Sequence, residues 1–286
     1  MKRPFALVLL AGLGLAAVAL PVHAQFQAPF PSPKATVAQT IGVTDVSVSY
    51  SRPLVKGRKI WGDLVPFDKP WRTGANQATT ISFSDDVTVE GKKLAAGTYA
   101  LVTIPGPDAW TVVFNLDTAL WFRTDYNEAL DVLRVKVKPA AGEFLESFEI
   151  SFQNVGADAA KLVLAWEKLR VPVALQVDTK GHAVAKAREA VARAKSDDWE
   201  TPLAVARYYA GEKVNGAEAL ALLDKSIAIK KGYANVGWKA RVLAQEGKVS
   251  DAIKTGEEAV ALAKAAPEKP NTAALEKLIA EWKAKK

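Results

Sequence analysis

The hydrophobic period of the chain changes once, at the polar stretch 178–181, whose sequence is Asp-Thr-Lys-Gly. On its N-terminal side, apolar and polar residues alternate over short runs, as at Val46, Val48 and Tyr50, which is the pattern of a half-buried strand. On its C-terminal side, apolar residues recur with the period of an amphipathic helix. The chain has 286 residues, enough for two cores of ordinary size. We therefore expect a β domain over 35–178 and a helical domain over 179–286.

The β domain is predicted to be an all-β antiparallel sandwich or barrel-like fold, because its short alternating runs are separated by turn-forming residues. The loop 105–108, Pro-Gly-Pro-Asp, is the clearest of these turns. Asp85 and Asp86 are adjacent, so a turn explains them better than a carboxylate pair on one face of a strand. The expected strands are 37–41, 43–50, 79–83, 87–89, 99–104, 110–116, 132–137, 144–152, 162–166 and 171–177, with one helical turn at 125–130.

The second domain is predicted to be a small all-α domain of six helices. Thr201 is the expected N-cap of the second helix, with Pro202 at its first position, and Asn215 and Asn271 are the expected caps of two others. Gly211, Gly232 and Gly247 are expected to stop or separate helices. The predicted helices are 183–196, 202–212, 216–229, 233–246, 249–265 and 272–284.

Two helical stretches repeat one another. The offset of 33 positions between Ala219 and Ala252 recurs between Ser226 and Ala259, with small residues where two helices must approach closely. This pattern resembles the tetratricopeptide-type helical hairpin, whose usual period is about 34 residues. Lys239 and Gly256 depart from it, standing where leucine and an aromatic residue are usual. A generic helical bundle is the alternative reading.

The N-terminus has the layout of a secretory signal peptide. Lys2 and Arg3 precede an uncharged apolar run over 5–20, and Val22-His23-Ala24 supplies small residues for cleavage before Gln25. The run is shorter than the roughly 20 residues that a spanning helix needs, which disfavours a membrane anchor. We expect a signal peptide over 1–24, an extended proline-containing leader over 25–34, a periplasmic or secreted protein, and no transmembrane segment after cleavage.

The composition excludes several kinds of chemistry. The chain has no cysteine, which excludes thiol catalysis, disulfides and zinc–thiolate sites. His182 is the one histidine left once the signal peptide is removed, so a histidine metal cluster cannot form. We therefore expect no metal, no cofactor and no assigned catalytic residue, while carboxylate, tyrosine or lysine chemistry stays open. Residues 179–286 hold 20 basic and 14 acidic residues, interleaved along the helices, so no nucleic-acid partner is expected.

The turn-rich segment 49–81 concentrates arginine and tryptophan. Guanidinium groups beside indole rings suit stacking and the bidentate recognition of anions, and tryptophans with polar neighbours suit sugar rings. In the alternative reading, Trp61 and Trp71 plug one end of the sandwich, and the arginines pair with Asp63 and Asp68 and cap loop carbonyls. The candidate ligand-binding residues are Arg52, Arg58, Trp61, Trp71, Arg72 and Asn76.

The same segment carries a family resemblance. The strings Ser-Tyr-Ser-Arg-Pro at 49–53, Trp-Arg-Thr-Gly-Ala-Asn at 71–76 and Gly-Thr-Tyr at 97–99 resemble DUF family 2911, a bacterial domain of unknown function that is often exported. The likeness covers about residues 32–177. Ala95-Ala96 departs from it, because proline is expected before Gly97. The resemblance implies a domain but no reaction, cofactor or substrate.

Two functions fit these observations. The first is an exported cell-envelope binding or scaffolding protein, whose helical repeat docks a protein or peptide and whose β domain takes an anionic or carbohydrate ligand. The alternative is a carboxylate-dependent envelope hydrolase acting on glycans, which requires two carboxyl groups about 5–10 Å apart across a groove. Its candidate acids are those in predicted loops, namely Asp63, Asp68, Asp125 and Glu143. Whether the chain is an enzyme stays open at this point.

Overall fold

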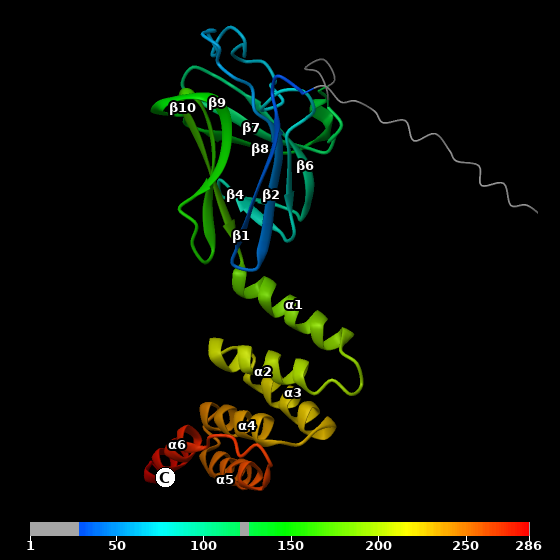
Figure 1. Cartoon of the computed structure of the whole chain (residues 1–286), viewed down its shortest axis with the longest axis vertical. Helices are drawn as coiled ribbons and strands as arrows, with labels where there is room; N and C mark the ends of the chain where they lie inside the picture. Colours follow the sequence, from blue (N-terminus) through cyan, green and yellow to red (C-terminus); the bar gives the residue numbers. More distant parts are fainter. Residues whose placement is uncertain (1–28, 121–125, 286) are drawn as a thin grey trace, which may run out of the picture.

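The computed structural model describes residues 29–120 and 126–285. The expected signal peptide and its cleavage site lie outside these residues, and so does Asp125. Antiparallel sheets form the N-terminal part and six helices follow them, which confirms the predicted fold class, and the sheets of the described part do not close into a barrel. Figure 1 shows the sheets as a sandwich, with the helices stacked beyond one of its ends.

The larger sheet has six strands in the order β1-β2-β3-β6-β7-β8, and the smaller has four in the order β5-β4-β10-β9. All neighbouring strands are antiparallel. The strands of the larger sheet are β1 (Lys34–Ile41), β2 (Thr44–Ser51), β3 (Thr80–Phe83), β6 (Gly97–Ile104), β7 (Trp110–Asn115) and β8 (Asp131–Val137). Those of the smaller sheet are β4 (Val87–Val89), β5 (Lys92–Leu94), β9 (Ala140–Gln153) and β10 (Ala159–Val177).

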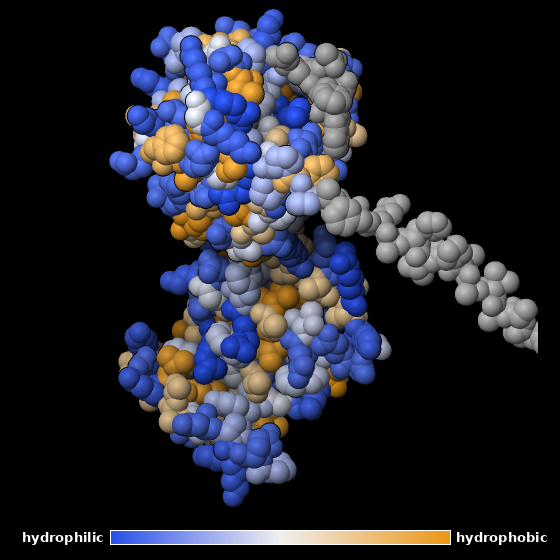
Figure 2. Space-filling model, turned by 45° about the horizontal axis from the view of Figure 1, so that its top comes forward, coloured by the Kyte–Doolittle hydropathy of each residue, from blue (hydrophilic) through white to orange (hydrophobic). Residues whose placement is uncertain are grey.

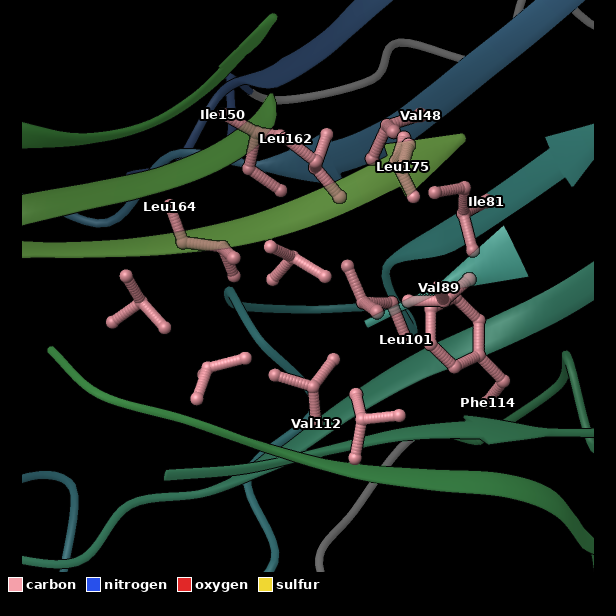
Figure 3. Packing of buried hydrophobic residues seen from close by; sticks show 14 of the residues in the cluster. Val48, Ile81, Val89, Leu101, Val112, Phe114, Ile150, Leu162, Leu164 and Leu175 are labelled. Atoms are coloured by element: carbon pink, nitrogen blue, oxygen red, sulfur yellow. The ribbon is translucent and has the colours of Figure 1, made fainter. Parts of the chain in front are cut away.

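The inward residues of both sheets form one apolar core. Val48, Ile81 and Leu101 of the larger sheet lie against Leu162 and Leu175 of the smaller one, and all five are fully buried (Figure 3). Each comes from a run in which alternate residues face inward, so the predicted period of two is the physical basis of the sandwich. Outside the core, hydrophilic side chains cover most of the face shown in Figure 2.

The strand prediction failed at three places. β5 has one apolar residue among three, so its sequence carries no strand pattern. The two strands expected over 162–177 are one strand, β10, whose register shifts around Glu167, a residue with φ of +52°. The strand expected to start at residue 144 starts at Ala140, as β9. The expected helical turn is the short 3₁₀ helix η2 (Glu128–Leu130).

The helices are α1 (Thr179–Arg193), α2 (Glu200–Glu212), α3 (Gly216–Ile229), α4 (Tyr233–Gln245), α5 (Val249–Ala265) and α6 (Ala273–Ala284). Their bounds agree with the prediction at α3 and α5 and differ by a few residues at some ends of the others. Consecutive helices pack in pairs and stack away from the sandwich (Figure 1). None of these helices is long and apolar enough to cross a bilayer.

The predicted helix ends are right at some positions and wrong at others. Asp198 accepts hydrogen bonds from the backbone of Glu200 and Thr201, so α2 begins before the expected Thr201 cap. Asn215 occupies the N-cap position of α3, as predicted, but its side chain makes no cap bond. Gly211 lies inside α2 instead of stopping it. Asn271 does accept a hydrogen bond from the first turn of α6, although Thr272 is the residue next to that helix.

The polar stretch at 178–181 is not a flexible linker. Asp178 is the N-cap of α1 and accepts a hydrogen bond from Gly181, so residues 179–181 form the first turn of the helix. Val177 ends β10, which leaves a single residue between sheet and helix. The aspartate that favours a turn in the sequence is here the cap of a helix that continues directly from the sandwich.

Candidate functional site

The arginine–tryptophan segment forms the loops at the end of the sandwich opposite α1 (Figure 1). It connects β2 to β3 and is fixed to the sheets by backbone hydrogen bonds. Trp71 and Thr103 exchange two such bonds, of 2.7 and 2.8 Å, and Val55 donates to the carbonyl of Glu146. Buried Thr79 donates to the carbonyl of Thr73 at 2.6 Å. These bonds hold an irregular segment in one conformation.

Four tryptophans and a phenylalanine fill this end of the core. The Trp71 ring stacks on Trp166 at 5.9 Å, and both rings lie edge-on to Phe148. Trp61 packs edge-on against Trp71, Trp110 and Trp166 at 4.9 to 5.9 Å. We name this group the aromatic plug. Trp61 and Trp71 therefore have the packing expected of core residues, although both are only half-buried.

A pocket of about 630 Å³ opens beside the aromatic plug. We call it the Arg–Trp pocket, since two arginines and two tryptophans are among its lining residues. At its wall, a Cβ on Gly74 would lie 3.0 Å from the Ser51 carbonyl oxygen, and φ there is +153°, so only glycine lets the two segments approach this closely. The lining residues are Ser32, Pro53, Arg58, Asp63, Leu64, Val65, Pro66, Pro70, Trp71, Arg72, Gly74, Ala75 and Trp166.

Arg72 is the most unusual group in the pocket. Its side chain is half-buried, and its Nε is inaccessible to solvent and has no hydrogen-bond partner among the described residues. Nor does any carboxylate in the described part of the chain lie within 4.0 Å of its guanidinium. Burial lowers the pKa of Arg72 from its usual value, but arginine stays charged at neutral pH. The pocket thus holds a positive charge that the surrounding side chains do not neutralise.

Arg58 adds a second guanidinium at the exposed edge. Its Nε donates to the Val55 carbonyl at 3.1 Å and its Nη2 to the Leu54 carbonyl at 2.6 Å. Both acceptors are loop carbonyls, and the alternative reading of the sequence expected the arginines to cap such groups. The two bonds fix the orientation of Arg58 and leave its other N–H groups free to bind.

Arg52 and Asn76 lie outside the pocket lining. Arg52 forms an ion pair of 3.1 Å with Glu149 and donates to the Phe148 carbonyl, which ties β2 to β9. Asn76 has φ of +58° and donates to the Ser32 carbonyl at 2.9 Å, so it shapes a turn. Among the six candidates, the structure therefore brings Arg58, Trp71 and Arg72 together in the pocket lining.

The expected partners of the arginines are wrong. Asp63 and Asp68 form no ion pair in the described part of the chain, and Arg52 pairs with Glu149 instead. Asp63 lines the pocket, whereas Asp68 and Glu143 do not. Asp63 and Asp68 lie in loops as expected, whereas Glu143 lies in strand β9, so its predicted loop position is wrong. The sequence pattern cannot show which way a loop side chain points.

Trp166 is the pocket residue that sequence reasoning missed. It lies on β10, far along the chain from Trp71, and it ends a continuous apolar run that marks it only as a buried strand residue. It is almost fully buried and lines the pocket from behind Trp71, on which it stacks. The position of Trp166 behind Trp71 follows only from the way the strands pair and pack.

The comparisons with known proteins agree with the extent of the sandwich. A family model described as a protein of unknown function, DUF2911, matches residues 32–175. This range includes the loop segment, the aromatic plug and the whole lining of the Arg–Trp pocket. No curated protein and no solved structure matches the chain.

Proposed function

Because the chain belongs to the DUF2911 family, whose function is unknown, we propose a function from the site itself: an exported binding protein of the cell envelope. In this proposal the Arg–Trp pocket takes a small anionic carbohydrate. The helical region provides a docking surface for a partner, and the signal-like N-terminus directs the chain out of the cytoplasm.

The observation that carries the proposal is the uncompensated charge of Arg72 beside two indole rings. A half-buried guanidinium without an acceptor costs free energy, and a ligand oxygen would recover it. Half-buried Trp71 supplies an apolar surface against which the C–H face of a sugar ring can pack, and buried Trp166 supports it from behind. A carboxylate-bearing sugar satisfies both requirements in one molecule.

The pocket supports binding better than glycan hydrolysis. Hydrolysis by carboxylates needs an acid and a second carboxylate on opposite sides of the scissile bond. Within the described residues, Asp63 is the single carboxylate in the lining of the Arg–Trp pocket. Arginine, tryptophan and proline make up much of the remainder, and these side chains hold a ligand without exchanging protons at neutral pH.

Titration calorimetry on residues 25–286 tests the proposal. We expect glucuronate or galacturonate to bind and glucose or galactose, which lack the carboxylate, to bind about tenfold more weakly or not at all. Arg72→Met should remove the preference for the acid sugar. Arg193→Gln is the matched control, because Arg193 is exposed on α1, away from the pocket. Equal binding of acid and neutral sugars, or full binding by Arg72→Met, would contradict the proposal.

A further inference from the structure

The helical region holds a second pair of arginines without carboxylate partners. Of its four arginines, Arg188 pairs with Glu218 at 2.8 Å and Arg193 pairs with Glu189 at 3.1 Å. Arg207 and Arg241 form no ion pair with any residue that the structure describes. Several lysines of the helices also lack an ion pair, but Arg207 and Arg241 are the two arginines of this region without a described carboxylate partner, and both lie against one indole ring.

Arg207 and Arg241 are held by the same indole. Arg207 on α2 and Arg241 on α4 each place Cζ 5.2 Å from the ring centroid of Trp238. Trp238 is half-buried and packs against the core formed by α2 and α3, so its ring is fixed. Arg241 donates one N–H to the Gly237 carbonyl at 2.9 Å. Stacking orders both guanidiniums and leaves most of their N–H donors free.

The surface around the two arginines is lined by small residues. On α2, exposed Ala204 and Gly211 lie one turn before and one turn after Arg207. A Cβ on Gly211 would meet no atom within 4 Å, so the surface is open at this point. Gln245 on α4 reaches the Ala210 carbonyl of α2 at 3.4 Å, which joins the two helices beneath it. An extended chain could lie close to the backbone here.

We propose that the surface formed by Arg207, Trp238 and Arg241 binds an acidic peptide segment of a partner protein. This rests on the docking role proposed above for the helical region, and it names the chemistry of the partner. Residues 179–286 carry 20 basic and 14 acidic residues, so their net charge attracts an acidic chain. Two ordered guanidiniums on neighbouring helices suit two carboxylates borne by one chain, each held by paired N–H donors.

The experiment uses residues 25–286 and a short fluorescent peptide of alternating glutamate and alanine. The matched control peptide has glutamine in place of glutamate. Fluorescence polarisation should show binding of the glutamate peptide, and binding that weakens as salt is added. Arg207→Gln and Arg241→Gln should each weaken it about tenfold, and Arg207→Lys should weaken it less than Arg207→Gln. Arg193→Gln removes the same charge from α1 and should leave binding unchanged.

The inference is overturned if the glutamine peptide binds equally well, or if Arg207→Gln and Arg241→Gln bind like Arg193→Gln. Self-association that is lost in Arg207→Gln would also overturn it, because the occupant would then be a second copy of the chain. Acid-sugar binding is measured in the same variants. Acid-sugar binding should survive in Arg207→Gln, and peptide binding should survive in Arg72→Met. Loss of only one of the two activities in the native chain would then show which proposal fails.

Discussion

Lys186 on α1 places its ammonium 2.7 Å from the carboxylate of Asp85, which lies between β3 and β4. The same ammonium donates to the Val43 carbonyl at 2.8 Å. One turn earlier on α1, His182 Nδ1 lies 3.1 Å from the hydroxyl of buried Thr44. The first helix is therefore docked on the end of the sandwich by polar contacts, and the sequence, which marks Asp85 only as a turn residue, gave no sign of it.

The Lys186–Asp85 contact should make stability depend on pH. Burial alone would raise the pKa of Asp85, but hydrogen bonds from Lys186, Ser84 and Thr44 outweigh it and hold the pKa below its usual value. A carboxyl with a lowered folded-state pKa stabilises the fold above its unfolded pKa, about 3.9, and this contribution is lost as pH falls through the lower folded pKa. Asp85→Asn should cost about 1 kcal/mol at neutral pH and progressively less in acid.

Urea unfolding of the native chain and of Asp85→Asn at a series of pH values measures this difference. Asp224→Asn is the control, because Asp224 makes a similar contact with Lys239 but lies far more exposed on α3. A stability difference for Asp85→Asn that stayed constant down to strongly acidic pH would contradict the assignment.

Gly42, in the turn between β1 and β2, should resist substitution by alanine. Its φ is +59°, and a Cβ there would lie 2.0 Å from the Thr179 hydroxyl and 2.7 Å from the Ala157 carbonyl oxygen. Gly91 has a similar φ of +78°, but a Cβ there would meet no atom within 4 Å. Gly91→Ala should therefore cost only the left-handed backbone strain, about 1–2 kcal/mol. Gly42→Ala should cost clearly more because α1 must also move.

Thermal unfolding of both variants tests this difference between the two glycines. Thr179→Ala in the Gly42→Ala background removes both Thr179 atoms that clash with the new Cβ and should recover part of the loss. Equal destabilisation by the two alanines would mean that the contact between the turn and α1 is too loose to matter.

The sandwich and the helical region should fold as separate units. The docking contacts of α1 on the sandwich are polar, whereas Val184, Ala187 and Val191 of α1 pack on the core of α2 and α3. Residues 25–178 expressed alone should give a β-type circular dichroism spectrum and residues 179–286 a helical one. An insoluble first fragment beside a well-behaved full chain would show that the parts need each other to fold.

The sequence predicted elements well where one periodicity runs without interruption. The helix bounds at α3 and α5 came out as expected because apolar residues keep the helical period from end to end. β10 was split in two because Glu167 and Lys168 interrupt its alternation, although the backbone passes through them as one strand. Local pattern cannot show that a strand survives such a break.

The candidate site was predictable in composition but not in geometry. Arg58, Trp71 and Arg72 stand in one dense segment, so the sequence could single them out together. Whether an arginine meets a carboxylate depends on which strands lie behind the loop, and Glu149 on β9 reaches Arg52 while no described carboxylate reaches Arg72. Those relationships join residues far apart in the chain, which no local pattern encodes.

The last prediction separates the two roles that the Arg–Trp pocket combines. Trp71 stacks on Trp166, donates from Nε1 to the Gly74 carbonyl at 3.0 Å and belongs to the aromatic plug. Trp71→Ala should therefore cost about 3–5 kcal/mol, as for a large core residue. Arg72→Met removes a half-buried charge that has no partner and keeps an apolar stem of similar length. It should leave the free energy of unfolding unchanged within about 0.5 kcal/mol or raise it, because the desolvation cost disappears with the charge.

Urea unfolding of both variants in residues 25–178 measures the contrast, with Arg52→Met as the control that does break an ion pair. A large loss of unfolding free energy for Arg72→Met would show that the guanidinium stabilises the fold, and this would contradict the proposal that the pocket is a binding site.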